Sequence, residues 1–104
     1  MIRLMVLYPN TPGARFDHKY YAEKHIPLFK EKMGTFGLVD TEIDKGMSGV
    51  MPGTPAPFVA VFLAKFKSAE DFQKGLEAHG TELLADIPNY TDIQAQFQLS
   101  EIAG

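Results

Sequence analysis

The sequence has no cysteine among its 104 residues. Disulfide bridges, thiolate-bound metal ions and cysteine nucleophiles are therefore excluded. A chain of this length is near the common size of one domain, and it buries roughly two-thirds of the surface of its unfolded form. We therefore expect one domain over residues 1–104, with a core that needs neither a disulfide nor a structural metal ion.

Long apolar runs and charge of one sign are lacking as well. No apolar stretch approaches the ~20 residues of a membrane span, and the N-terminal run of residues 1–8 is too short for a signal peptide. The net charge is −3, and between residues 17 and 32 lysines alternate with acidic side chains. Nucleic-acid binding needs a clustered basic patch instead. We expect a cytoplasmic protein that has neither a membrane nor a nucleic acid as a partner.

The motifs of cofactor-dependent enzymes are also missing. The sequence contains no phosphate-cradling loop, no Rossmann glycine pattern and no nucleophile elbow. Its three histidines, His18, His25 and His79, lack the spacing of a metal site. We expect no cofactor and no metal ion.

The segments that are present predict an α+β fold. Alternation and apolar β-type composition predict strands over residues 1–8, 36–45, 58–66 and 91–102. Residues 58–66 are apolar on both faces, which is typical of a strand inside a sheet. Residues 46–57 are rich in glycine and proline, and we expect a mobile connection that lies over a pocket mouth or at the edge of a dimer.

Two helices are expected between these strands. The first begins at Asp17 as its N-cap and runs to about Met33, with a kink or a new helical turn at Pro27 because proline removes a backbone hydrogen bond. The second begins at Ser68, runs to about His79 and stops at Gly80. The apolar spacing continues beyond this glycine, which leaves room for a further short helix there.

The resulting order, βαββαβ, is that of the ferredoxin-like fold. It gives a four-stranded antiparallel sheet with both helices on one face. The other face would combine a glutamine-rich last strand with an apolar third strand, which suits a sheet-to-sheet contact between two copies. We therefore expect a homodimer.

Residues 16–28 carry the signal of a known family. They read Phe-Asp-His-Lys-Tyr-Tyr-Ala-Glu-Lys-His-Ile-Pro-Leu, which resembles the EthD-like pattern of a Phe-Asp start, a Tyr-Tyr pair and His-x-Pro-Leu. Residues 87–93 and 98–102 are similar to the last strand of that family. The resemblance implies a dimeric α/β barrel. The wider superfamily includes isomerases, cofactor-independent monooxygenases, haem enzymes and proteins of no known activity, so the resemblance implies the fold more closely than the function.

The candidate site lies on the first helix, where a helical wheel places Tyr21, His25 and Phe29 on one apolar face. A histidine there can transfer protons near neutral pH, and a tyrosine can donate a hydrogen bond to a developing oxyanion. We therefore take His25 and Tyr21 as candidate catalytic residues. The candidate substrate-binding residues are Tyr20, Leu28, Phe29 and His79. As alternatives, His25 can be a core histidine bonded to a backbone carbonyl, and His79 can cap the end of its helix.

Three functions are compatible with such a domain. The first is a small catabolic or secondary-metabolism enzyme that acts on a small apolar or aromatic compound by proton transfer or cofactor-free oxidation. The second is a non-catalytic protein that binds such a compound or assists a monooxygenase or ether-degradation system. The third is a structural homodimer. A cavity that meets a titrating His25 would favour the first, a cavity without such a group the second, and no cavity the third.

Overall fold

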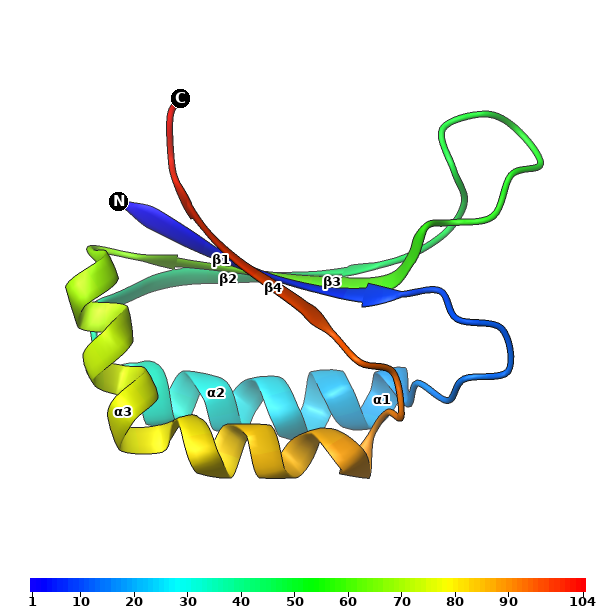
Figure 1. Cartoon of the computed structure of the whole chain (residues 1–104). Helices are drawn as coiled ribbons and strands as arrows, with labels where there is room; N and C mark the ends of the chain where they lie inside the picture. The colour runs from blue at the N-terminus through cyan, green and yellow to red at the C-terminus, as the bar shows by residue number, and fades with distance from the viewer.

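The computed structural model describes all of residues 1–104 and contains one antiparallel sheet with helices on one of its faces (Figure 1). Its strands are β1 (Ile2–Pro9), β2 (Leu38–Lys45), β3 (Phe58–Phe66) and β4 (Gln96–Glu101). They lie in the order β2-β3-β1-β4. The ferredoxin-like prediction is confirmed, and so is the internal place of residues 58–66.

The first helical segment has three parts, α1 (His18–Tyr20), the π-helical turn η1 (Tyr21–His25) and α2 (Ile26–Met33). The carboxylate of Asp17 accepts a hydrogen bond from the backbone N–H of Tyr20 at 3.0 Å, which confirms the predicted N-cap.

The π turn lies directly before Pro27, which is in the first turn of α2. Proline has no N–H, and its ring clashes with the carbonyl four residues earlier in a regular α-helix. The wider turn, in which the N–H of Ile26 bonds to the carbonyl of Tyr21, accommodates the proline without ending the helix. It also rotates the buried face, so that Ile26 is buried and Ala22 is exposed.

The second helix, α3 (Ala69–Asp86), is continuous and leads into the short 3₁₀ turn η2 (Ile87–Asn89). Its start is as predicted, because the Ser68 hydroxyl accepts a hydrogen bond from the N–H of Asp71 at 3.1 Å. The predicted stop at Gly80 is wrong. Gly80 is buried against the core within the helix, and Leu83 beyond it is buried too. Packing of this apolar face therefore outweighs the low helix propensity of glycine.

The last strand is shorter than predicted, because β4 begins at Gln96 and not at residue 91. Thr91 instead forms an isolated bridge with Phe16. Its hydroxyl accepts from the N–H of Ile93 at 3.0 Å and donates to the carbonyl of Arg15 at 2.6 Å. These bonds join the segment before β4 to the start of the first helical segment, close to the site described below.

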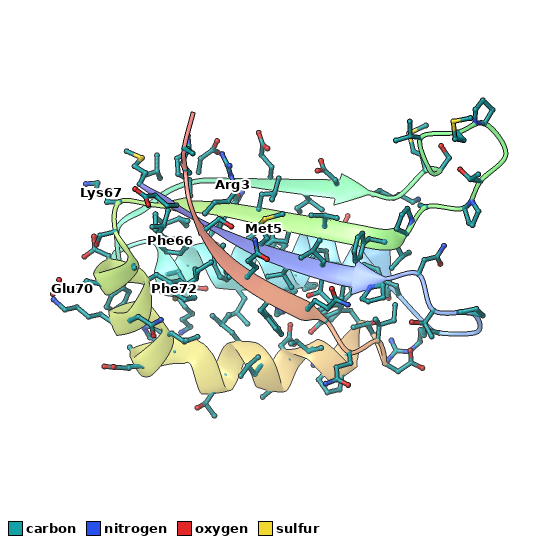
Figure 2. The ribbon with its side chains drawn as sticks, turned by 45° about the horizontal axis from the view of Figure 1, so that its top comes forward. Arg3, Met5, Phe66, Lys67, Glu70 and Phe72 are labelled. Carbon is teal, nitrogen blue, oxygen red and sulfur yellow. The ribbon has the colours of Figure 1, made fainter.

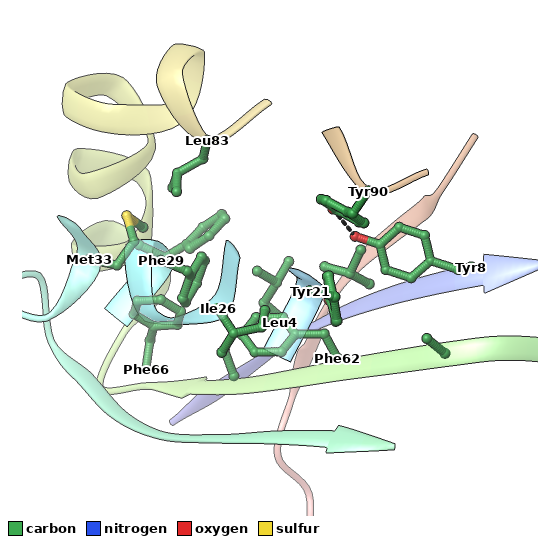
Figure 3. Close-up of a cluster of buried hydrophobic side chains, with 14 of the residues drawn as sticks. Leu4, Tyr8, Tyr21, Ile26, Phe29, Met33, Phe62, Phe66, Leu83 and Tyr90 are labelled. Atoms are coloured by element: carbon green, nitrogen blue, oxygen red, sulfur yellow. Dashed lines mark hydrogen bonds between the residues drawn. The ribbon is translucent and has the colours of Figure 1, made fainter. Parts of the chain in front are cut away.

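Fifteen buried hydrophobic side chains form one core between the sheet and the helices (Figure 3). The register places Val6 of β1 opposite both Phe62 of β3 and Phe97 of β4, so all three point toward the helices. The opposite face of the sheet has no covering element (Figure 1). None of the helices has the length and apolar character that crossing a membrane requires.

The connection over residues 46–57 rises on the side of the sheet away from the helices (Figure 1). Three of its apolar side chains, Met47, Val50 and Met51, are strongly exposed. Because the loop stands beside the uncovered face, it is placed at the edge of any dimer formed by that face and not over the cavity between sheet and helices.

Candidate functional site

A cavity of about 490 Å³ lies between the sheet and the helices. Fifteen of its 18 lining residues are hydrophobic, and they come from β1, β3 and β4 on one side and from η1, α2, α3 and η2 on the other. The lining is most exposed where α3 faces β4, at Leu84 and Phe97. The cavity therefore opens to solvent between the end of α3 and the edge strand.

His25 is a lining residue that is held by three neighbours. Its ring is stacked on that of Tyr21, with centroids 5.6 Å apart, and lies 4.7 Å from that of Tyr90. Its Nδ1 lies 2.8 Å from Oδ2 of Asp86. The Nε2 atom has no partner in the protein, and no buried polar side-chain atom lacks one. Nε2 is therefore accessible from the cavity that His25 lines.

The tautomer of His25 follows from its partner. An ionised carboxylate only accepts hydrogen bonds, so Nδ1 carries the proton and donates it to Asp86. The other nitrogen, Nε2, is left with a free lone pair. Burial lowers the pKa of His25 below its ordinary value, more than the hydrogen bond and charge of Asp86 raise it. The neutral imidazole therefore presents a basic atom to the cavity at neutral pH.

Asp86, the last residue of α3, accepts three hydrogen bonds. Besides the one from His25, Oδ1 accepts from the Tyr20 hydroxyl at 2.7 Å and from the Asn89 side-chain amide at 2.8 Å. Burial raises the pKa of this carboxyl, but the donors Tyr20, Asn89 and His25 together outweigh it, so the pKa lies below its ordinary value. Asp86 is thus an ionised anchor that orients His25.

Three tyrosines surround the same end of the cavity (Figure 3). The hydroxyls of Tyr8 and Tyr90 are hydrogen-bonded at 2.7 Å. The ring of Tyr21 lies 5.5 Å from that of Tyr8 and 4.9 Å from that of Tyr90. Burial raises the pKa of all three phenols. They are therefore neutral hydroxyls that can donate hydrogen bonds.

The structure brings together only some of the residues selected from the sequence. His25, Tyr21 and Phe29 line the cavity. Tyr20 does not line it, but its hydroxyl bonds to the carboxylate that orients His25. Leu28 packs against the core outside the lining.

His79 also lies outside the lining, with Nδ1 3.0 Å from Oε1 of Glu82 on the same helix. It does not cap the end of a helix, because α3 continues seven residues further to Asp86. No group of three or more metal-ligating side chains converges anywhere in the chain.

Sequence reasoning missed Tyr8, Asp86 and Tyr90. Asp86 is 61 residues from His25 along the chain, and no local spacing rule links two such positions. Tyr90 lies in the segment that resembles the family's last strand, and this resemblance was the one feature of the sequence that could have pointed to Tyr90 as a site residue. Tyr8 follows an alternating pattern with Leu4 and Val6, which predicts burial but not a polar partner.

The family model of the EthD domain matches residues 13–94. The chain belongs to the EthD domain family. The matched range contains His25, its anchor Asp86 and the phenol of Tyr90, while Tyr8 lies just before it.

Solved structures similar to this EthD-domain chain agree with its fold. An EthD-like protein from Ralstonia eutropha is 43% identical, with a TM-score of 0.91 over 96% of this chain and 89% of that one. An ethyl tert-butyl ether D (EthD) family protein from Bacillus halodurans is 18% identical, with a TM-score of 0.68 over 99% of each chain. A dimeric ferredoxin-like protein from an uncultured marine organism is 11% identical, with a TM-score of 0.58 over 100% of this chain and 96% of that one. No curated protein matches the sequence.

Proposed function

We propose that this EthD-domain protein is a small enzyme that transfers a proton to or from a small apolar or aromatic compound, with His25 as the acid–base group. The observation that carries the proposal is the arrangement of the His25 imidazole. Nδ1 is bonded to Asp86, and Nε2 has no protein partner and meets an apolar cavity. A histidine that only filled the core would have both nitrogens satisfied by the protein or would lie away from a cavity.

The lining supports an uncharged ligand. It contains no lysine, arginine, aspartate or glutamate, so nothing there would pair with an ionic group. The volume, about 490 Å³, lies within the range of small-molecule pockets. Cofactor-free oxidation of such a compound would begin with the same removal of a proton by His25, so both reactions proposed for the domain need the same base.

A non-catalytic binding or accessory role is the second candidate. The 15 hydrophobic lining residues support it, because they are sufficient to hold an apolar molecule without any chemistry. The two candidates differ in what His25 does. A base is required for proton transfer, whereas binding alone needs only the cavity.

The experiment uses 2-tetralone, an apolar bicyclic ketone that exchanges its acidic C–H hydrogens. Its deuteration in D₂O, followed by NMR, measures proton transfer directly, and its dissociation constant measures binding. We expect the wild-type protein to accelerate exchange and His25→Gln to retain binding while losing the acceleration. His79→Gln, which changes a histidine outside the lining, is the control and should behave as wild type. Tight binding with no acceleration by the wild type would support the second candidate instead.

We also infer that the chain forms a homodimer through the uncovered face of its sheet. The register aligns Leu63 with Met5 across β3 and β1, with Glu42 on one side and Gln98 on the other. The face thus has an apolar centre and polar margins, as protein interfaces do. Figure 2 turns this face toward the viewer and shows Arg3 and Met5 on β1.

A further inference from the structure

The buried hydrogen bond between Tyr8 and Tyr90 does not involve His25. Tyr8 is 2% exposed, points from β1 toward the helices and lines the cavity, whereas Tyr90 is fully buried and does not line it. Burying hydroxyls in an apolar core is unfavourable unless they are hydrogen-bonded, and phenylalanine would fill the same space without that demand. Packing alone therefore does not explain why two tyrosines occupy these positions.

The direction of the hydrogen bond follows from what surrounds each hydroxyl. Each phenol has one hydrogen to donate. If Tyr8 donated to Tyr90, the hydrogen of Tyr90 would have no acceptor, because the Tyr8 oxygen is its one hydrogen-bond partner. If Tyr90 donates to Tyr8, the hydrogen of the fully buried Tyr90 has an acceptor, and the hydrogen of Tyr8 is free to point into the cavity that Tyr8 lines.

Each of the three phenols keeps its hydrogen, because burial raises its pKa more than any neighbour lowers it. Burial raises the pKa of Tyr8, but its interactions with Tyr90 and Tyr21 lower it. The same interactions add to burial in raising the pKa of Tyr90 and of Tyr21. A hydroxyl that accepts a hydrogen bond donates its own hydrogen more strongly, so a bond from Tyr90 would strengthen Tyr8 as a donor.

Tyr8 and His25 share one end of the cavity. The rings of Tyr21 and Tyr90 lie between them: both are within 6.0 Å of the Tyr8 ring, and both are within 5.6 Å of the His25 ring. The other end is lined by apolar side chains such as Met33, which Figure 3 shows at the side of the core away from Tyr8. A ligand thus meets the phenols of Tyr8 and Tyr21 and one base at one end, and apolar side chains at the other.

We propose that the Tyr8 hydroxyl donates a hydrogen bond to the ligand oxygen that becomes negative when His25 removes a proton. The ligand class is then a neutral ketone with an apolar body and a hydrogen on the carbon beside the carbonyl. This inference rests on the proposed function and adds to it the donor and the class of substrate.

In such a step Nε2 of His25 forms a bond to the proton on the carbon beside the carbonyl. The electron pair of that C–H bond becomes a carbon–carbon double bond, and the carbonyl π pair moves to the oxygen, where Tyr8 stabilises it. Returning the proton from His25 to the same or to another carbon completes an exchange or an isomerisation. No oxidant, reductant or cofactor is required.

The test compares 2-tetralone with tetralin, the same bicyclic body without the carbonyl. Tyr8→Phe should weaken tetralone binding by roughly tenfold, since a hydrogen bond is lost, and slow deuterium exchange by roughly a hundredfold, the scale seen when one oxyanion donor is removed. Tetralin should bind the wild type and Tyr8→Phe equally well. Tyr90→Phe should give losses in the same direction but smaller, because Tyr8 keeps its own hydrogen.

The infrared carbonyl stretch of bound tetralone gives a readout that does not depend on how well a variant folds. In the wild type the stretch should move to lower frequency than in an apolar solvent, as expected of a carbonyl that accepts a hydrogen bond. His79→Gln, which changes a side chain outside the lining, should leave that shift in place.

The possible failures are distinguishable. An unshifted carbonyl in the wild type, or equal tetralone affinity in wild type and Tyr8→Phe, would overturn the role of Tyr8 while leaving His25 as the base if exchange is still accelerated. Failure of both compounds to bind would overturn the proposed function itself.

Discussion

At the scale of single residues, the chemistry depends on which atom of His25 faces the cavity. Burial alone would leave a neutral imidazole in either tautomer. The hydrogen bond to Asp86 selects the one with the proton on Nδ1, and the donors Tyr20 and Asn89 keep the carboxylate in place. The proposed base is therefore oriented by residues that do not line the cavity.

Replacing the anchor should change both the pKa and the tautomer of His25. In Asp86→Asn the amide oxygen keeps the donors Tyr20 and Asn89, so its N–H faces Nδ1, and the imidazole proton moves to Nε2. Asp86 raises the pKa of His25, so its loss should lower that pKa further. The ¹⁵N shifts of the ring check both effects. Deuterium exchange should fall by roughly two orders of magnitude, within the range of general-base catalysis. A ring with unchanged shifts would contradict the role given to Asp86.

His25 should also make the stability depend on pH. Its pKa in the folded chain is below the ordinary 6.5, so the unfolded chain binds the proton more readily. Stability is then fully present above pH 6.5 and is lost as the pH falls toward the folded pKa. Urea melts should show this loss in the wild type and a weaker one in His25→Gln. In His25→Gln some loss of stability at low pH should remain, because burial also lowers the pKa of His18. Parallel pH profiles for the two proteins would argue that His25 is not desolvated.

At the scale of the elements, prediction succeeded where a local rule was sufficient. Residues 58–66 form β3 to the residue, and the caps at Asp17 and Ser68 lie where the side-chain oxygens indicated. It failed at Gly80, where distant packing decides, and at Pro27 it predicted a kink or a new helical turn without specifying the π turn that the structure has there. The pairing of His25 with Asp86 requires two helices to be placed side by side, which no local pattern predicts.

The two glycines of α3 should respond in opposite ways to alanine. A Cβ at Gly80 would lie 2.9 Å from Cδ1 of Leu76, a partly exposed side chain that can move. The gain in helix propensity, about 1 kcal/mol, should therefore prevail, and Gly80→Ala should raise the melting temperature while narrowing the cavity and weakening tetralone binding.

Gly75→Ala is the matched comparison. A Cβ there would lie 2.7 Å from Cε of Met33, which is fully buried, and 3.1 Å from Cβ of Phe36. The core must shift, and overpacking typically costs about 1–3 kcal/mol, so this variant should melt at a lower temperature. Thermal melts of both proteins test the pair, and stabilisation by Gly75→Ala would show that packing around Met33 is looser than the structure indicates.

At the scale of the whole molecule, the fold has one broad face that no element covers. The chain measures 41 × 34 × 19 Å, and the sheet lies across its broad dimensions (Figure 1). Such a face can provide the ~800 Å² per partner that a stable interface needs. The cavity opens between α3 and β4 on the other side of the sheet, so pairing through the uncovered face leaves the ligand route open.

This arrangement predicts a homodimer that dissociates when one charged side chain is introduced into the uncovered face. At micromolar concentration, light scattering should give twice the chain mass of 11.6 kDa. Leu63 lies near the centre of the uncovered face and points away from the core, so Leu63→Lys should give the monomer mass with unchanged circular dichroism. A lysine buried without a partner in each copy costs several kcal/mol, more than such an interface can offset. Gln73→Lys, at an exposed position of α3 on the other side of the sheet, is the control and should remain dimeric. A wild type of 11.6 kDa would refute the dimer but not the role of His25, because every residue of the cavity described above belongs to one chain.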